Sequence, residues 1–423
     1  MGKVAPGFGP ARYAGPLEAW RGHVVGLDTV PMAAFLALLA TRVGVSGAVL
    51  NTVMSYSTEG GMIFEKLHPA SLGLIGLGAI GFPEFLQSGP TRPVRGVVAL
   101  IAAVVFSMLV AVITGNTLSL GYLIDSVLVA PFCVVTLSRM NADQVRTTFQ
   151  VLFLVLVANA LLTLAEYVLQ ARALPFDESE DIFRPTGLMS HPLLVGLTMA
   201  TAVPSAFYGP LRSRGAWIVA FLFEIAALAA GARAAGIVGA AVLGAAALSR
   251  ALGAMNERRL SVPGFVTVVL LMVLGIASLG LVAVEYGLTS RIEGGFDDES
   301  SRARVDVYDI LFHLTPNELL FGSSLAEAME FLRGELKLEY IESPLVFFVI
   351  QFGVVGTVPI VSGILYFIST LSNGMGGIIT ALAFVIVAST NNTFSTKGPA
   401  LVLVTALLWC CRESGAPKRA PFG

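Results

Sequence analysis

The chain has 423 residues, of which 55% are hydrophobic and 13% are charged. Soluble domains carry about 25% charged residues, so this composition and a mean hydropathy of +0.80 exclude an ordinary soluble protein and predict an integral membrane protein. The net charge of −2 provides no basic surface for nucleic acid. Cys133, Cys410 and Cys411 all lie in apolar runs, which argues against a disulfide framework or a zinc site.

The N-terminal segment 1–28 contains Arg12, Arg21 and many Gly and Pro residues. It does not resemble a signal peptide, so we expect the first apolar run to remain as a span. A membrane-spanning helix needs about 20 predominantly apolar residues. The apolar runs predict about twelve spans, the first of them interrupted by Arg42, at 29–50, 69–86, 94–115, 117–137, 147–170, 191–209, 215–232, 234–251, 263–286, 344–369, 374–391 and 397–412.

Charge between the spans predicts the orientation of the chain. Lys and Arg are more frequent in the connections on the same side as the N-terminus, and acidic residues gather in the others. The positive-inside rule then places both termini in the cytoplasm. The expected organisation is a cytoplasmic segment 1–28, helices 1–9 over 29–286, an outward loop with short helices at 287–343, helices 10–12 over 344–412, and a cytoplasmic tail at 413–423.

The longest polar segment, 291–344, lies between two apolar runs. In a bilayer such a segment forms a water-facing loop or a cavity covered by helices. Helical spacing after a Ser cap at 300 or 301 predicts one face with Arg302, Asp306, Asp309 and His313, and another with Val305, Tyr308 and Phe312. The acidic run 297–299 is best explained as a solvated turn.

Glu342 lies at the start of the next apolar run. Partial burial raises the pKa of a carboxylate toward the range of a general base, so Glu342, or with less support Glu339, is a candidate base. An acid at a helix N-terminus, or an ion-pair partner for an arginine, is an equally good interpretation.

Three arginines lie near span ends on the predicted outward side: Arg184, Arg233 and Arg304. Each alone is better explained by snorkelling or by pairing with an acid. Together they suggest a phosphate site, because the planar guanidinium group binds phosphate through two parallel hydrogen bonds. Beside lipid, we expect the ligand to be a lipid-linked phosphate or pyrophosphate.

Four acidic residues fall within the apolar runs: Asp125, Glu166, Glu224 and Glu285. Internal hydrogen bonds that fix helix packing are our preferred interpretation of them, and a proton or ion path is the alternative.

Four stretches carry a resemblance to a known family: FRPTGLMSHPLLVGL, AGARAAGIV, SSRARVDVYDILFHLTPNELLFGSS and ESPLVFFVIQFGVVG. In their order and spacing, over roughly residues 180–400, the chain resembles the bacterial O-antigen ligase and Wzy-type polysaccharide polymerase superfamily, in particular its exopolysaccharide-polymerase branch. The first five spans match that family only as hydrophobic helices.

The resemblance implies an all-α inner-membrane glycosyltransferase of about twelve helices, with glycosyltransferase-C-like architecture and a large, partly helical periplasmic loop. Such proteins transfer a glycan from undecaprenyl pyrophosphate to an acceptor hydroxyl without a metal or other cofactor. Arg184 and Arg233 match the outer-face arginines of the family, and Arg304 with Tyr308 matches its Arg-x-x-x-aromatic motif. Where many ligases have His-Asn, this chain has Glu342-Ser343, which favours a polymerase over a ligase.

The expected function is therefore polymerisation of a lipid-linked glycan, with membrane lipid and a chain-length regulator or export complex as candidate partners. Ligase-type transfer, a transporter or flippase that uses Asp125 and Glu224 for coupling, and a non-catalytic subunit of an export complex are the alternatives. The expected catalytic residues are Glu342, Arg233 and Arg304. The expected substrate-binding residues are Arg184, His191, Arg302, Tyr308, Glu339 and Lys397.

Overall fold

The computed structural model describes residues 27–56, 65–117, 120–174, 183–209, 215–256, 305–336, 338, 341, 343–390, 394 and 397–414. Within these residues the regular structure is entirely helical. The first helices are α2 (Thr29–Gly44), α3 (Gly47–Asn51), α4 (Pro69–Gln87), α5 (Arg92–Ile113), α6 (Leu120–Tyr122), the π-helix η3 (Leu123–Leu128), α7 (Val129–Ser138) and α8 (Ala142–Leu169). They are followed by α9 (Pro192–Tyr208), α10 (Ala216–Ala229), α11 (Arg233–Asn256), the 3-10 helix η4 (Val307–Asp309), α15 (Ile310–His313), α16 (Pro316–Phe321), α17 (Leu325–Gly334), α18 (Pro344–Leu371), α19 (Gly374–Ser389) and α20 (Ala400–Ser414).

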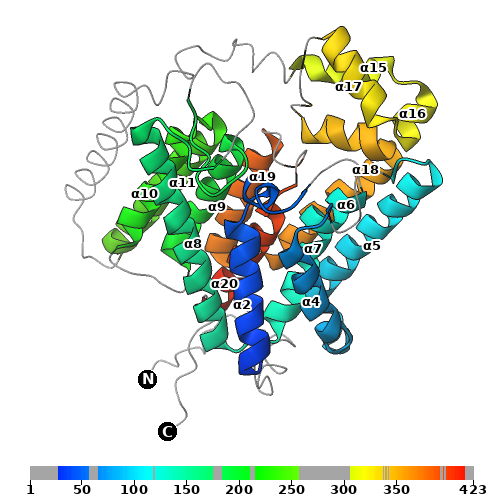
Figure 1. The fold of residues 1–423 in the computed structure, drawn as a ribbon. Coiled ribbons are helices and arrows are strands. Elements are labelled where there is room, and N and C mark those ends of the chain that lie inside the picture. Colours follow the sequence, from blue (N-terminus) through cyan, green and yellow to red (C-terminus); the bar gives the residue numbers. More distant parts are fainter. Residues whose placement is uncertain are drawn as a thin grey trace, which may run out of the picture.

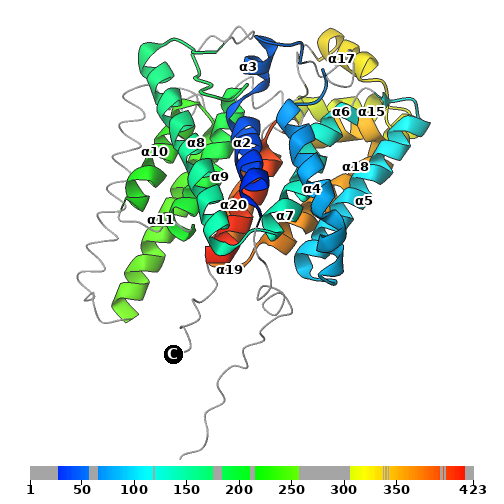
Figure 2. The same ribbon diagram turned by 60° about the horizontal axis from the view of Figure 1, so that its bottom comes forward.

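The long helices form one bundle. In both views α8, α10 and α11 lie on one side and α4, α5 and α18 on the other, with α2 and α20 between them (Figures 1 and 2). Helix α9 is buried continuously from Leu194 to Phe207, and α20 from Ala400 to Cys411. These two helices therefore form the centre on which the others pack.

Five of the described helical segments are long and apolar enough to cross a membrane: Pro69–Gln87, Arg92–Ile113, Leu120–Ser138, Ala142–Leu169 and Pro344–Leu371. Shorter apolar helices occupy the other predicted spans that the structure describes, with α2 and α3 together covering the first. The predicted span 263–286 lies outside the described residues. The helical class is confirmed, and the full number of spans stays a prediction.

Large apolar side chains are exposed along the outside of the bundle. A soluble protein rarely leaves an extensive apolar surface in contact with water, whereas lipid tails make such a surface favourable. Examples from four helices are Ile80 (74% exposed), Leu109 (56%), Leu154 (69%) and Ile218 (75%). With the long apolar helices, these faces define an α-helical membrane protein.

Close helix packing in the bundle depends on small residues, as is usual within membranes. The Ser107 hydroxyl of α5 donates a hydrogen bond to the carbonyl of Gly356 in α18, at 2.7 Å. A Cβ at Gly363 would lie 2.9 Å from the Ala103 side chain of α5. Helices α5 and α18 therefore pack with their backbones unusually close.

Polar contacts define one end of the bundle. Arg139, after α7, pairs with Glu84 of α4 at 3.2 Å, and Arg412 of α20 donates to the carbonyl of Thr370 in α18 at 3.4 Å. The opposite end carries η4, α15, α16 and α17 (Figure 1). We call residues 305–336 the cap and this end of the bundle the cap end.

Helix α18 is kinked at Gly353, where φ is +61°. The backbone of Leu320 and Phe321 in the cap packs directly against this glycine, so a Cβ there would collide with main-chain atoms. The Asn116 side chain donates to the carbonyls of Ser323 at 2.8 Å and Gln351 at 2.7 Å. The kink thus provides the space in which the cap is attached to the bundle.

The cap corrects one predicted helix face. We expected Tyr308 and Phe312 to share a face, but Tyr308 contacts Ser343 at the start of α18, whereas Phe312 lines a different cavity, within the cap. The reason is the 3-10 turn Val307–Asp309, which changes the angular spacing that a continuous α-helix would have. Asp309 and His313 do line the same cavity.

Candidate functional site

The segment that precedes α9 is held by polar side chains of α8. Both backbone N–H groups of Thr186 and Gly187 donate to Oε2 of Glu166, each at 2.8 Å. The N–H of Leu188 donates to Oδ1 of Asn159 at 2.7 Å. The interpretation of Glu166 as an internal hydrogen-bonding group is confirmed, and its carboxylate fixes the loop in which Arg184 lies.

Arg184 is buried, and its Nε donates to the carbonyl of Ala230 at 3.1 Å. Ala230 begins the turn between α10 and α11, in which Gly231 has φ of +66°. A Cβ on Gly231 would lie 3.2 Å from Nε of Arg184. The turn ends at Arg233, the first residue of α11. Arg172 donates from Nε and Nη2 to the carbonyl of Arg184, both at 3.1 Å. Arg172, Arg184 and the turn that carries Arg233 therefore lie together, and we call this place the arginine corner.

A second polar cluster surrounds Asp125, which is fully buried in the π-helix η3. Arg42 of α2 approaches its carboxylate at 3.4 Å, and the same Nη2 donates to the carbonyl of Gly398 at 2.9 Å. The hydroxyl of Tyr56 and the backbone N–H of His68 donate to the two carboxylate oxygens. Asp125 therefore joins α2, α4, η3 and the residues before α20.

His68 and Tyr56 are both neutral in this cluster. Nδ1 of His68 accepts from the N–H of Ala70 at 3.1 Å, so Nε2 carries the proton and donates to the carbonyl of Val45 at 3.0 Å. Burial, and next the positive charge of Arg42, lower the pKa of His68 to about 4. Burial, and next the charge of Asp125, raise the pKa of Tyr56 above its usual value.

Lys397 lies beside this cluster and is 8% exposed. Its Nζ donates to the carbonyl of Lys66 at 2.6 Å and lies 4.6 Å from the centre of the Tyr56 ring. Burial is the main cause that lowers the pKa of Lys397 to about 8. The ammonium group is thus a cation whose charge changes close to neutral pH.

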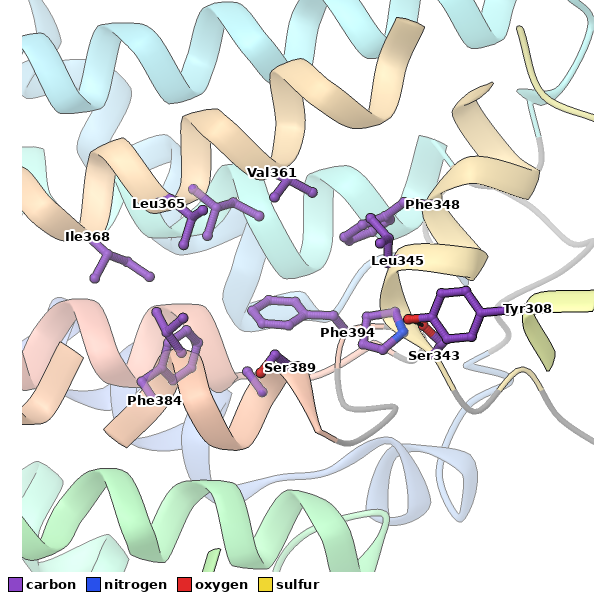
Figure 3. A pocket seen from close by; sticks show the side chains of 14 residues that line it. Tyr308, Ser343, Leu345, Phe348, Val361, Leu365, Ile368, Phe384, Ser389 and Phe394 are labelled. Atoms are coloured by element: carbon purple, nitrogen blue, oxygen red, sulfur yellow. Dashed lines mark hydrogen bonds between the residues drawn. The ribbon is translucent and has the colours of Figure 1, made fainter. Parts of the chain in front are cut away.

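An apolar cavity of about 310 Å³ lies between α18 and α19, with its mouth toward the cap (Figure 3). Its polar mouth is formed by Tyr308 and Ser343, which are joined by a 3.0 Å hydrogen bond. Its interior is lined by Leu345, Phe348, Val361, Leu365, Ile368, Phe384 and Phe394, among others. The cavity suits a hydrocarbon chain better than a polar ligand.

The cavity, the lysine and the arginine corner occupy the same end of the bundle. Phe394 lines the cavity, and three residues later Lys397 joins the Asp125 cluster. The next residue, Gly398, lies against Leu194 near the start of α9. His191 caps that helix, with Nδ1 accepting from the N–H of Leu193 at 3.1 Å. Lys397, the arginine corner and the mouth of the apolar cavity therefore lie at one end of the bundle.

The structure describes five of the predicted site residues. Arg184 and Arg233 are brought together at the α10–α11 turn, Tyr308 lies at the mouth of the apolar cavity, and His191 and Lys397 lie at the cap end. Four predicted site residues lie outside the described residues: Arg302, Arg304, Glu339 and Glu342.

Sequence reasoning missed Arg42, Tyr56 and His68 as members of a polar cluster, and Arg172 as part of the arginine corner. One available signal was the presence of opposite isolated charges, Arg42 and Asp125, inside two apolar runs, since charges within the membrane usually pair. For Tyr56 and His68 the sequence offered no comparable signal.

The fold and the cap-end site define an α-helical membrane protein with basic side chains and an apolar cavity at the same end of the bundle. Comparison with protein-family models, with curated proteins and with solved structures finds no match for this chain.

Proposed function

We propose that the protein is a bacterial inner-membrane polysaccharide polymerase that acts on a glycan carried by undecaprenyl pyrophosphate, at the periplasmic face. The observation that carries the proposal is that basic groups and an apolar cavity lie at the same end of the bundle. A lipid-linked pyrophosphate has the same two parts, a polyanionic head and a hydrocarbon tail. The sequence resemblance to O-antigen ligases and Wzy-type polymerases independently supports the same substrate.

In this proposal Arg233 and Arg304 bind the pyrophosphate, and Arg184 holds the turn from which Arg233 extends. The tail of the donor lies in the apolar cavity. The oxygen of the acceptor hydroxyl attacks the anomeric carbon while the bond from that carbon to the pyrophosphate oxygen breaks. Glu342 takes the hydroxyl proton, and the arginines stabilise the negative charge that develops on the departing diphosphate.

The transporter alternative uses Asp125 and Glu224 as coupling groups, and Asp125 has the larger set of contacts in the structure. Asp125 is fully buried and engaged by Arg42, Tyr56 and the backbone of His68, which suits an internal hydrogen-bonding role better than cycles of ion binding. These contacts favour chemistry at one face over transport across the membrane.

The test uses purified protein in nanodiscs with lipid-linked repeat units and no nucleotide sugar, and product length is followed on a gel. The parent should form a ladder. Arg233→Ala should abolish it, and Arg233→Lys should lower the rate by about tenfold or more, because lysine keeps the charge but loses the bidentate geometry. Arg95→Ala is the control, since Arg95 is exposed on α5 near the opposite end of the bundle.

Normal polymerisation by Arg233→Lys and Arg233→Ala would remove the arginine corner from the proposal. Transfer in a single step to a separate acceptor would identify a ligase. Movement of the lipid-linked unit between leaflets without any product would identify a transporter instead.

A further inference from the structure

The cap has a cavity of its own, separate from the apolar cavity. Its volume is about 610 Å³, and it lies between α15 and the C-terminal part of α17. We call it the cap cavity. It is lined by Asp309, Phe312, His313, Phe331, Glu335 and Leu336.

Aromatic rings form one wall of the cap cavity. Phe312 is 85% exposed, an unusual state for a phenylalanine in a short helix whose other apolar residues are buried (Ile310) or partly buried (Leu311). The His313 ring packs against the Phe331 ring at 4.4 Å and is held by a 3.0 Å hydrogen bond between Nδ1 and the carbonyl of Asp309. The His313 and Phe331 rings therefore hold one another in place before any ligand is bound.

Carboxylates form the rest of the polar lining. Asp309 and Glu335 are both exposed, and within the described part of the chain neither forms an ion pair with Lys or Arg. Their oxygens are hydrogen-bond acceptors only. A fitting ligand must then supply hydrogen-bond donors, present an apolar face to the rings, and carry no negative charge, because like charges at short distance repel.

A sugar without acidic groups meets these conditions. Its hydroxyls donate to carboxylates through charge-assisted hydrogen bonds, and the C–H face of a pyranose ring packs on an aromatic ring. The mixture of aromatic side chains and a few polar groups in a concave site is typical of small-molecule binding.

We propose that the cap cavity is a saccharide-binding site for uncharged sugars. We assign the acceptor glycan to this site, and that assignment rests on the proposed function. The short segment η4–α15 supports that assignment, because Tyr308 lines the apolar cavity and the next residue, Asp309, lines the cap cavity. Consecutive residues thus line the expected place of the lipid donor and the sugar site.

The site can be tested by binding alone, with the full chain in nanodiscs and no lipid-linked donor. Saturation-transfer NMR with cellotetraose should show contact between the sugar C–H groups and the protein. Phe312→Ala and Glu335→Gln should each weaken binding by about fivefold to tenfold, the loss expected of one aromatic or one charge-assisted contact. Tetragalacturonate, which is anionic, should bind more weakly than cellotetraose.

The matched controls are Glu327→Gln and Leu320→Ala, which alter exposed side chains of the cap outside the cavity lining and should leave binding unchanged. Unchanged binding in Phe312→Ala and Glu335→Gln, or binding of spermidine but of neither saccharide, would overturn the proposal.

The two proposals fail separately. If cellotetraose binds as expected but the parent forms no polymer from lipid-linked units, the sugar site stands and the polymerase function falls. If the parent polymerises while Phe312→Ala and Glu335→Gln leave both sugar binding and the KM for the acceptor unchanged, the function stands and the cap cavity is not its acceptor site.

Discussion

Arg42 and Asp125 place opposite charges deep in the bundle, with 3% and 0% of their side chains exposed. Removal of one member of such a pair leaves the other charge without compensation in a low-dielectric environment. The cost of that loss is typically about 3 to 5 kcal/mol, whereas replacement of both members can be nearly neutral. The pair therefore constrains which substitutions the bundle accepts.

We predict that Arg42→Met and Asp125→Asn each lower the thermal unfolding midpoint strongly, and that the double variant is more stable than the sum of the two losses implies, by about 1 to 3 kcal/mol. Thermal unfolding in detergent, followed by intrinsic fluorescence, measures all three. Arg139→Met is the control, because the Arg139–Glu84 pair is 30% and 64% exposed and exposed pairs contribute about 0 to 1 kcal/mol. If the stability loss of the double variant equals the sum of the two single losses, Arg42 and Asp125 do not stabilise one another.

Lys397 predicts a pH dependence of donor binding. Its ammonium group is charged below a pKa of about 8 and neutral above it, so an anionic donor should lose affinity as the pH rises through about 8. The KM for the lipid-linked donor should therefore increase between about pH 7 and pH 9. In Lys397→Arg the charge persists over this range, and the increase should disappear. An identical pH profile in both proteins would exclude Lys397 from donor binding.

At the level of whole elements, the kink of α18 couples the cap to the bundle. Gly353→Ala should destabilise the protein, because its φ of +61° is unfavourable for alanine and the new Cβ would meet the backbone of Leu320. Gly76→Ala in α4 is the matched control: a Cβ there meets nothing within 4 Å, and alanine favours a helix by about 1 kcal/mol. Unfolding midpoints that fall equally in both variants would contradict this account of the kink.

The helices themselves were predictable, and their interruptions were not. Long apolar runs define a spanning helix through local composition, so the long helices that the structure describes lie at predicted spans. The short helices of the cap were predicted without their bounds. The kink at Gly353 and the π-helix around Asp125 depend on contacts with residues distant in the sequence, Leu320 and Arg42 respectively. One glycine in an apolar run does not differ from another until its neighbours are known.

At the level of the whole molecule, the apolar faces predict a lipid environment that can be tested by labelling. Cysteine placed at Ile80 or Leu154 should not react with a water-soluble maleimide in sealed membranes. Glu327→Cys in the cap should react with the maleimide. If the cap faces the periplasm, this reaction should also occur in intact spheroplasts. Background labelling of the native cysteines should be low, because Cys133, Cys410 and Cys411 are buried. Labelling of Glu327→Cys only after lysis would overturn the periplasmic placement.

The candidate site was predictable only in part. Arg184 and Arg233 were selected for their positions near span ends, and the structure does place them at one turn. Their different roles were not predictable, because burial of the Arg184 side chain depends on the fold of the loop around it. The apolar cavity and the cap cavity each combine residues from several elements, so no local pattern could have revealed them.

The attachment of the cap uses mainly main-chain atoms. Asn116 donates to two carbonyls, the N–H of Ser323 donates to the carbonyl of Ile350 at 2.7 Å, and backbone packs on backbone at Gly353. Main-chain contacts do not depend on the identity of neighbouring side chains. Substitutions of exposed residues on α15 and α17 should therefore leave the attachment of the cap to the bundle intact. A library of such substitutions would sample new ligand preferences on an unchanged membrane scaffold.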